Sequence, residues 1–381
     1  MVAGNVGDYA RAMTNHPSFL PLQRSGLLGA LALLCAAAPV AALQGAAYAG
    51  LWLLQSLALW ALCWQQAWQR RTLNRAHPQA PLYESLGLAN HLSLLRGLLI
   101  AATGGFLLRL PDAPLLIWVA AACYSVAAIL DRVDGFVARR TRHTSLLGAE
   151  LDTVYDAFGL VVAPLLAVLL GKVHASYLLV SGAYYLFVLA RSRRERLGLP
   201  VYPLLPNTLR RTLAGFQMGY VAVVLWPPFA AELTRLAGFA FMLPLLIGFV
   251  VDWLVVSGRI DASRQAAFDA LARFSERWLQ PLLRLLLGLL LLAQSLVADA
   301  SSLPAQLGSA LAALLILSGS GARLGALLLL LLWALWPPVA ATTPLFLSLL
   351  GCTVAVLLLG SGRFSLWQGD DHWVRRHDGA A

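Results

Sequence analysis

Apolar stretches long enough to cross a lipid bilayer recur along almost the whole chain, from residue 26 to residue 360. A spanning helix needs roughly 20 predominantly apolar residues, and inside lipid every backbone polar group must be hydrogen-bonded within the segment. The composition agrees, because 59% of the residues are hydrophobic and only 12% are charged. A soluble globular protein carries about 25% charged residues. The sequence therefore predicts an all-α integral membrane protein.

The apolar pattern predicts about twelve transmembrane helices, each of roughly bilayer length. We expect them over residues 26–45, 47–66, 88–109, 113–138, 147–171, 174–191, 211–229, 233–257, 280–298, 304–319, 322–341 and 343–360. Polar stretches near residues 70–85 and 258–277 interrupt the pattern and divide the chain into three predicted domains. These are an N-terminal transmembrane hairpin with a basic loop (1–80), a six-helix core (81–260), and a polar connector with a four-helix module and basic tail (261–381).

The formal net charge is +10, but the arginines cluster in short loops between the predicted spans. If the N-terminus lies in the cytoplasm, the arginine-rich loops all fall on the cytoplasmic side, and only Arg109, Lys172 and Arg235 fall outside. Short cytoplasmic loops are typically rich in Lys and Arg. The basic balance therefore indicates membrane topology and contact with anionic lipids, and it does not point to nucleic acid.

Carboxylates gather in one short window between two of the predicted spans. Five of the 18 acidic residues lie there, namely Asp131, Asp134, Glu150, Asp152 and Asp156. On helices, Asp131 and Asp134 share one face, and Asp152 and Asp156 share a face of the next helix. Two antiparallel helices would bring these four aspartates together at the cytoplasmic boundary, where charge needs a partner. Hard divalent cations with oxygen ligands are a suitable partner.

This window resembles the signature of the CDP-alcohol phosphotransferase family. It reads D-x-x-D-G-x-x-A-R, then eight residues, then G-x-x-x-D-x-x-x-D. Every signature position matches: Asp131, Asp134, Gly135, Ala138, Arg139, Gly148, Asp152 and Asp156. The earlier segment Ala89–Arg96 is similar to the family's P-N-x-L-T-x-x-R, with alanine in place of the proline and serine in place of the threonine.

The resemblance implies a metal-dependent enzyme that moves a substituted phosphate group from a CDP-linked alcohol to an acceptor hydroxyl and releases CMP. Magnesium or manganese is the implied cofactor, with two ions expected. The implied metal ligands are Asp131, Asp134, Asp152 and Asp156, and Asp156 is also the implied general base. The implied contacts of the CDP moiety are Gly135, Ala138, Arg139, Gly148, Asn90 and Ser93.

The expected setting is phospholipid synthesis at the bacterial inner (plasma) membrane, with CDP-diacylglycerol as donor and the site facing the cytoplasm. Donor, hydroxyl acceptor and membrane lipids are the expected partners, and the sequence leaves a homodimer open. Arg191, Arg194 and Arg211 are candidates for binding an acceptor phosphate through their guanidinium forks. The topology rule that places arginine in cytoplasmic loops explains the same residues.

The last four spans form a module to which no chemistry is assigned. Its ending, Gly360–Leu366, is similar to the closing G-x-G-R-x-S-L-D of the DoxX family, with Trp367 in place of the aspartate. A twelve-span ion-coupled transporter and a catalytically silent scaffold are the alternative interpretations of the whole chain. Transporter sites tend to lie near the bilayer midplane, between repeated halves, whereas these acids lie at one helix end and in one half.

Overall fold

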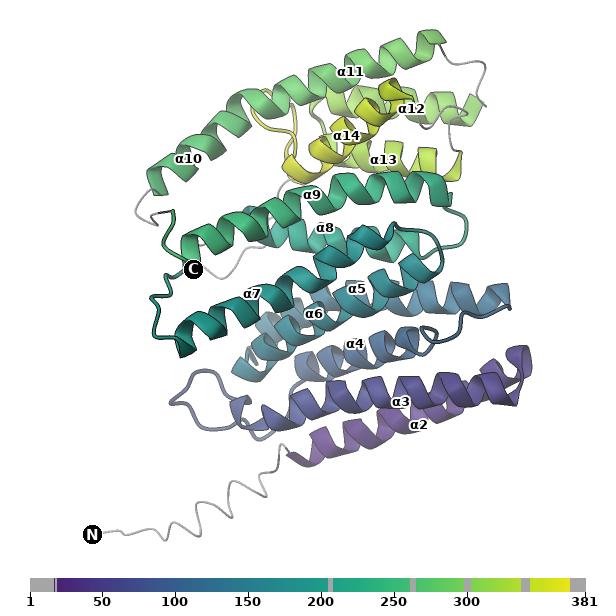
Figure 1. Ribbon diagram of the computed structural model, residues 1–381, viewed down its shortest axis with the longest axis vertical. Helices are drawn as coiled ribbons and strands as arrows, with labels where there is room; N and C mark the ends of the chain where they lie inside the picture. Colours follow the sequence, from purple (N-terminus) through teal and green to yellow (C-terminus); the bar gives the residue numbers. More distant parts are fainter. Residues whose placement is uncertain are drawn as a thin grey trace. The chain divides into compact units, whose positions relative to one another are not determined.

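The computed structural model describes residue 17 and residues 19–204, 208–260, 265–297, 303–336 and 343–370. Side chains of residues 208–211, 265–269 and 296–297 lie outside the described part. Within these ranges the regular elements are all helical, which confirms the predicted fold class (Figure 1). The helices are α2 (Phe19–Gln44), α3 (Ala46–Gln69), α4 (Leu88–Gly104), α5 (Pro114–Arg140), α6 (Leu146–Leu169), α7 (Leu178–Arg196), α8 (Thr208–Val224), α9 (Ala231–Val256), α10 (Gln265–Phe274), α11 (Gln280–Val297), α12 (Leu303–Ser318), α13 (Ala322–Leu335) and α14 (Pro344–Leu359).

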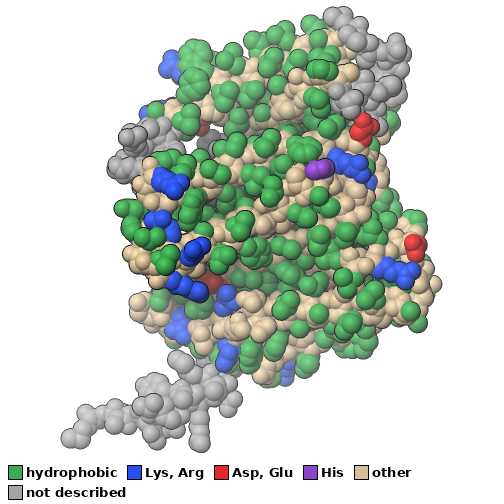
Figure 2. Space-filling model, in the orientation of Figure 1, with side chains coloured by type: hydrophobic (Ala, Val, Ile, Leu, Met, Phe, Trp, Pro, Cys, Tyr) green, Lys and Arg blue, Asp and Glu red, His purple; other side chains and the backbone are tan. Residues whose placement is uncertain are grey.

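Every predicted span overlaps one of these helices, and residues 337–341 of the predicted span 322–341 lie outside the described part of the chain. Six described segments are long and apolar enough to cross a membrane: α2, α3, α5, α6, α9 and the stretch Ala270–Ser295. Four shorter apolar helices, Thr212–Val224 in α8 and the helices α12, α13 and α14, correspond to four further predicted spans. The helices α4 and α7, at the predicted spans 88–109 and 174–191, belong to neither group, so the count of twelve spans is approximate. Figure 2 shows apolar side chains over most of the visible face, with Lys and Arg side chains toward its left and right edges. The chain is therefore a multi-pass membrane protein.

The described contacts form two compact units. The first comprises the described residues up to Leu170 together with Val221–Trp226, and the second comprises Gly171–Tyr220 and the residues from Pro227 onward. The predicted division into residues 1–80, 81–260 and 261–381 stays a prediction.

The first unit is organised around α4, which packs against α3, α5 and α6. The α2–α3 hairpin turns at Gly45, whose φ of 86° lies in the left-handed region that favours glycine. Indole groups of α3 donate hydrogen bonds to backbone carbonyls of α2, from Trp60 to Gly26 at 2.9 Å and from Trp64 to Leu22 at 3.0 Å. Burial of α4 between its neighbours brings its polar face against the acidic ends of α5 and α6.

The second unit contains a four-helix group, α11 to α14, in which buried arginines hold helix ends. The Arg284 guanidinium donates to the carbonyls of Ile316 and Leu317, both at 2.7 Å, and to Ser361 at 2.8 Å. Arg323 donates to the Leu357 carbonyl at 2.6 Å. The bonds to Ile316, Leu317 and Leu357 satisfy carbonyls that a helix C-terminus leaves without an intrahelical partner, and the bond to Ser361 holds the loop after α14.

Candidate functional site

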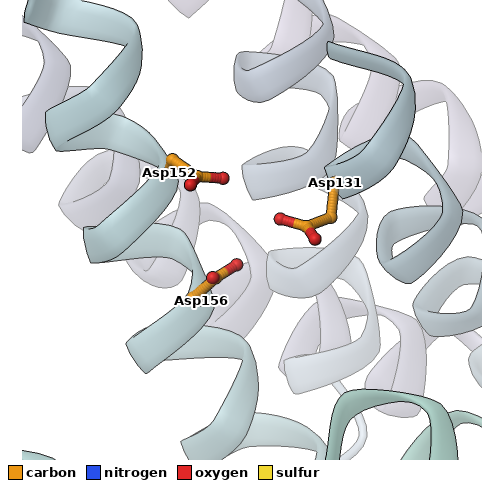
Figure 3. A group of neighbouring side chains, drawn as sticks. All are labelled: Asp131, Asp152 and Asp156. Atoms are coloured by element: carbon orange, nitrogen blue, oxygen red, sulfur yellow. The ribbon is translucent and has the colours of Figure 1, made fainter. Parts of the chain in front are cut away.

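Three carboxylates from two helices point toward one another in the first unit. Asp131 lies on α5, and Asp152 and Asp156 lie one turn apart on α6 (Figure 3). One oxygen from each group lies within 4.8 Å of the others. The tight turn between α5 and α6 ends at Ser145, whose hydroxyl caps α6 by accepting a hydrogen bond from Gly148 N at 3.0 Å.

A fully buried arginine from α4 lies among these carboxylates. Arg96 Nη1 contacts Asp131 and lies 3.3 Å from Asp152 Oδ1 and 3.7 Å from Asp134 Oδ2. Its second amino group, Nη2, lies 3.3 Å from Asp156 Oδ1. All four signature aspartates therefore converge on one guanidinium group.

The cluster of four aspartates and Arg96 contains more acidic groups than basic groups. With all four aspartates ionised, their formal charge would be −4, and the single guanidinium of Arg96 would offset one of these charges. Asp156 Oδ1 is buried and accepts no hydrogen bond, although Arg96 lies within ion-pair distance of it. An all-oxygen donor set with excess negative charge is what hard divalent cations require. The residues present therefore fit a metal ion.

Two polar residues of α4 lie beside the acids and are held by protein contacts. Ser93 Oγ donates to Asp134 Oδ2 at 2.8 Å and so orients that carboxylate. The Asn90 side-chain amide donates to Asn74 Oδ1 and Ser145 Oγ, both at 3.2 Å. Asn90 thus ties α4 to the capped start of α6 and to the loop that follows α3.

The predicted CDP contacts on α5 lie along its last two turns. Ala138 is half-buried, and Arg139 is exposed. A Cβ atom placed on Gly135 would lie 3.4 Å from Arg139 Nη1. The Arg139 guanidinium therefore lies back along α5, next to Gly135. This places a basic group beside the residue that directly follows Asp134.

Gly148→Ala is expected to lower the free energy of unfolding by about 1–3 kcal/mol, the usual cost of overpacking. The added Cβ would lie 2.9 Å from Asn90 Oδ1 and 3.3 Å from Ser145 Oγ, so the Asn90 contacts must shift. Thermal unfolding of the detergent-purified protein measures the effect. Gly182→Ala in α7 is the matched control, because its Cβ would meet nothing within 4 Å. Equal responses from the two variants would contradict the steric argument.

Two of the three arginines predicted to bind the acceptor, Arg191 and Arg194, have protein partners in the second unit. Arg191 Nε pairs with Glu195 at 3.0 Å. Arg194 Nη2 donates to the carbonyls of Pro200 at 3.0 Å and Ser257 at 3.4 Å, and so ties the end of α7 to the end of α9. The Arg211 side chain lies outside the described part of the structure. The acceptor role of these residues stays a prediction.

Arg96 is the central residue that the sequence interpretation did not assign to the site. It appeared there only as the last position of the Ala89–Arg96 segment. A signal was present, because Arg96 is a single charge in an apolar helix and follows Ser93 by three residues on the same helix face. A charged residue within an apolar span is a functional candidate by default.

An integral membrane protein with an all-oxygen carboxylate cluster of this kind has the groups needed for metal-assisted displacement at phosphorus. The model of the CDP-alcohol phosphatidyltransferase family matches residues 86–257. The match covers a little under half of the chain, and the matched segment contains Arg96 and the four aspartates. Comparisons with curated proteins and with solved structures gave no match. The DoxX-like character of the C-terminal module stays a prediction.

Proposed function

We propose that the protein transfers a substituted phosphate group from CDP-diacylglycerol to an acceptor hydroxyl and releases CMP. The family match supports transfer from a CDP-linked alcohol. The observation that carries the proposal is the convergence of the four signature aspartates on buried Arg96, inside the matched segment. The arginine-rich loops support a site that faces the cytoplasm of a bacterial inner membrane.

The metal ligands in this proposal are Asp131, Asp134, Asp152 and Asp156, which would hold two magnesium or manganese ions. Bound divalent cations would offset the charge of the diphosphate and of the departing CMP. Ser93 keeps Asp134 turned toward the cluster through its 2.8 Å hydrogen bond. Arg96 holds the carboxylates of α5 and α6 at one place, so the ligand set is assembled before substrate arrives.

Asp156 is the proposed general base. Its carboxylate takes the proton of the acceptor hydroxyl as that oxygen bonds to the phosphorus carrying the diacylglycerol. The bond from this phosphorus to the oxygen that bridges to CMP breaks, and CMP leaves with the electron pair. Asp156 has the location for this role, because it comes one helical turn after Asp152 and its Oδ1 has no hydrogen-bond partner.

Small and basic residues next to the acids are proposed to receive the CDP moiety. Small side chains allow a diphosphate to approach the helix backbone, and a guanidinium can bind its oxygens. The proposed contacts are Gly135, Ala138, Arg139, Gly148, Asn90 and Ser93. The acceptor would be bound by Arg191, Arg194 and Arg211.

The test is an assay of CMP release by the purified full-length protein. With CDP-diacylglycerol, magnesium and a panel of hydroxyl acceptors, we expect CMP to form with at least one acceptor. Excess EDTA should stop the reaction, and excess magnesium should restore it, because the carboxylate cluster needs cations to receive a diphosphate. Absence of both CMP release and metal-dependent CMP exchange would contradict the proposal. Solute uptake into proteoliposomes without CMP formation would instead support the transporter alternative.

A further inference from the structure

The described lining of a second candidate binding site belongs entirely to the second unit. A hollow of about 650 Å³ opens where the segment that joins α10 to α11 meets the loop after α14. This volume is within the ~300–1,000 Å³ range of ligand pockets. Three arginines line it, namely Arg273, Arg277 and Arg363. None of them belongs to the aspartate cluster or to the proposed transfer reaction.

The lining is basic and rich in hydrogen-bond donors. Among the described lining residues the three arginines face one acid, Glu276, so the formal charges of these residues sum to +2. Arg273 and Arg277 are four residues apart, a spacing at which like charges on a helix repel. Gln280 and Gln368 add side-chain amides to the same wall. Several guanidinium groups around one hollow are the usual recognition element for phosphate.

The backbone around the hollow has an irregular, well-anchored structure. Residues Ser275–Leu279 form a π-helical turn, a feature that occurs frequently at functional sites. The facing loop turns at Gly362, where φ is +69°, and Phe364 has a φ of 63°, which is uncommon for a residue other than glycine. Arg363 N donates to the Glu276 carbonyl at 2.9 Å and joins the two walls. Arg284 Nη1 donates a hydrogen bond of 2.8 Å to the Ser361 carbonyl and so anchors the same loop.

The same segment has the character of a membrane interface. The apolar stretch Ala270–Ser295 is long enough to span a bilayer, and Arg273 and Arg277 lie in its first turns. Phe274 and Trp278 are exposed beside them, and the Arg277 guanidinium lies 5.5 Å from the Trp278 ring centroid. Tryptophan is enriched at membrane–water interfaces, and basic pockets there bind anionic lipid head groups.

We propose that this pocket binds the phosphate group of an anionic phospholipid head group, held by Arg277 and Arg363 with Arg273 at the rim. A lipid can reach such a pocket laterally from the bilayer, with its acyl chains against the exposed apolar residues of the same segment. A soluble phosphate ester offers the same charged group without the chains. The binding assay therefore compares the two sources.

The assay titrates the detergent-purified full chain with dioleoyl-phosphatidylglycerol and counts bound lipids by native mass spectrometry. Arg277→Gln with Arg363→Gln should weaken the tightest binding event roughly thirty-fold, and either single change about five-fold, if each arginine contributes its usual share. Arg193→Gln with Arg196→Gln, two exposed arginines of α7, is the matched control and should change the affinity less than about two-fold. Thermal unfolding checks that each variant is folded.

A charge-conserving pair, Arg277→Lys with Arg363→Lys, keeps the assay decisive if the glutamine pair folds poorly. It should bind within about ten-fold of the parent, because the charge remains while the planar fork is lost. Competition by glycerol 3-phosphate at millimolar concentration would identify the phosphate group as sufficient, and its failure would assign affinity to the lipid as a whole. Equal losses in the pocket pair and the α7 pair, or no loss in either, would overturn the proposal.

Discussion

Asp156→Asn is expected to lower the rate of CMP release by about 10²–10⁴-fold, the usual contribution of a general base. Asparagine has nearly the same shape but cannot accept the proton of the acceptor hydroxyl. Rates of the purified parent and variant should be compared at saturating magnesium, so that weaker metal binding does not account for the loss. The assay is release of CMP from CDP-diacylglycerol with the best acceptor of the panel.

Glu150→Gln is the matched control for this experiment. Glu150 lies on the same helix as Asp156, is exposed, and pairs with Arg70 at 3.4 Å rather than with Arg96. Its neutralisation should leave the rate within about two-fold of the parent, because exposed ion pairs contribute little. If Asp156→Asn were as active as Glu150→Gln, Asp156 would not be the base, although the family match over residues 86–257 would stand.

Arg96→Gln is expected to lower the free energy of unfolding by about 3–5 kcal/mol, the cost of removing one partner from a buried ion pair. Arg96 is fully buried and lies within ion-pair distance of four aspartates. Without it, the carboxylates of α5 and α6 repel one another across the packing interface with α4. The measurement is thermal or denaturant unfolding of the purified protein in detergent, without added divalent cations.

Arg191→Gln provides the comparison for Arg96→Gln, because it removes an exposed i,i+4 ion pair with Glu195. Such pairs contribute about 0.3–0.5 kcal/mol. Added magnesium should recover part of the stability of Arg96→Gln, since a cation among the same carboxylates replaces the lost positive charge. An Arg96 variant as stable as the Arg191 variant would show that the four aspartates are not mutually destabilising.

Membrane spans and the acidic helix faces could be predicted from the sequence because both depend on local pattern. An apolar stretch of bilayer length must form a helix, because lipid offers no hydrogen-bond partner for the backbone and the helix satisfies its N–H and C=O groups internally. The spacing of Asp131 from Asp134, and of Asp152 from Asp156, specifies a shared helix face. The resemblance to the family signature predicted transfer from a CDP-linked alcohol, and the family match over residues 86–257 agrees with that prediction.

Residue partners that lie far apart in the sequence could not be predicted in this way. Arg96 precedes Asp152 by 56 positions, and no spacing rule relates α4 to α6. The Asn90 amide is held by Asn74 and Ser145, partners 16 and 55 positions away, and its predicted contact with the CDP moiety stays a prediction. Arg194 was considered for its charge, and the structure shows it hydrogen-bonded to Ser257, 63 residues further along the chain.

The sequence by itself determined that this protein is helical, crosses a membrane repeatedly and carries paired aspartates on adjacent helix faces. The shared helix faces follow from the 3.6-residue period of the helix. The helical, membrane-spanning character follows from the need to pair every backbone polar group within lipid. Only the tertiary structure decided that one buried arginine unites the four aspartates, and that a basic hollow forms where the segment that joins α10 to α11 meets the loop after α14. Helix packing decides which side chains meet, because it depends on the fit of whole helix surfaces rather than on the order of residues within one helix.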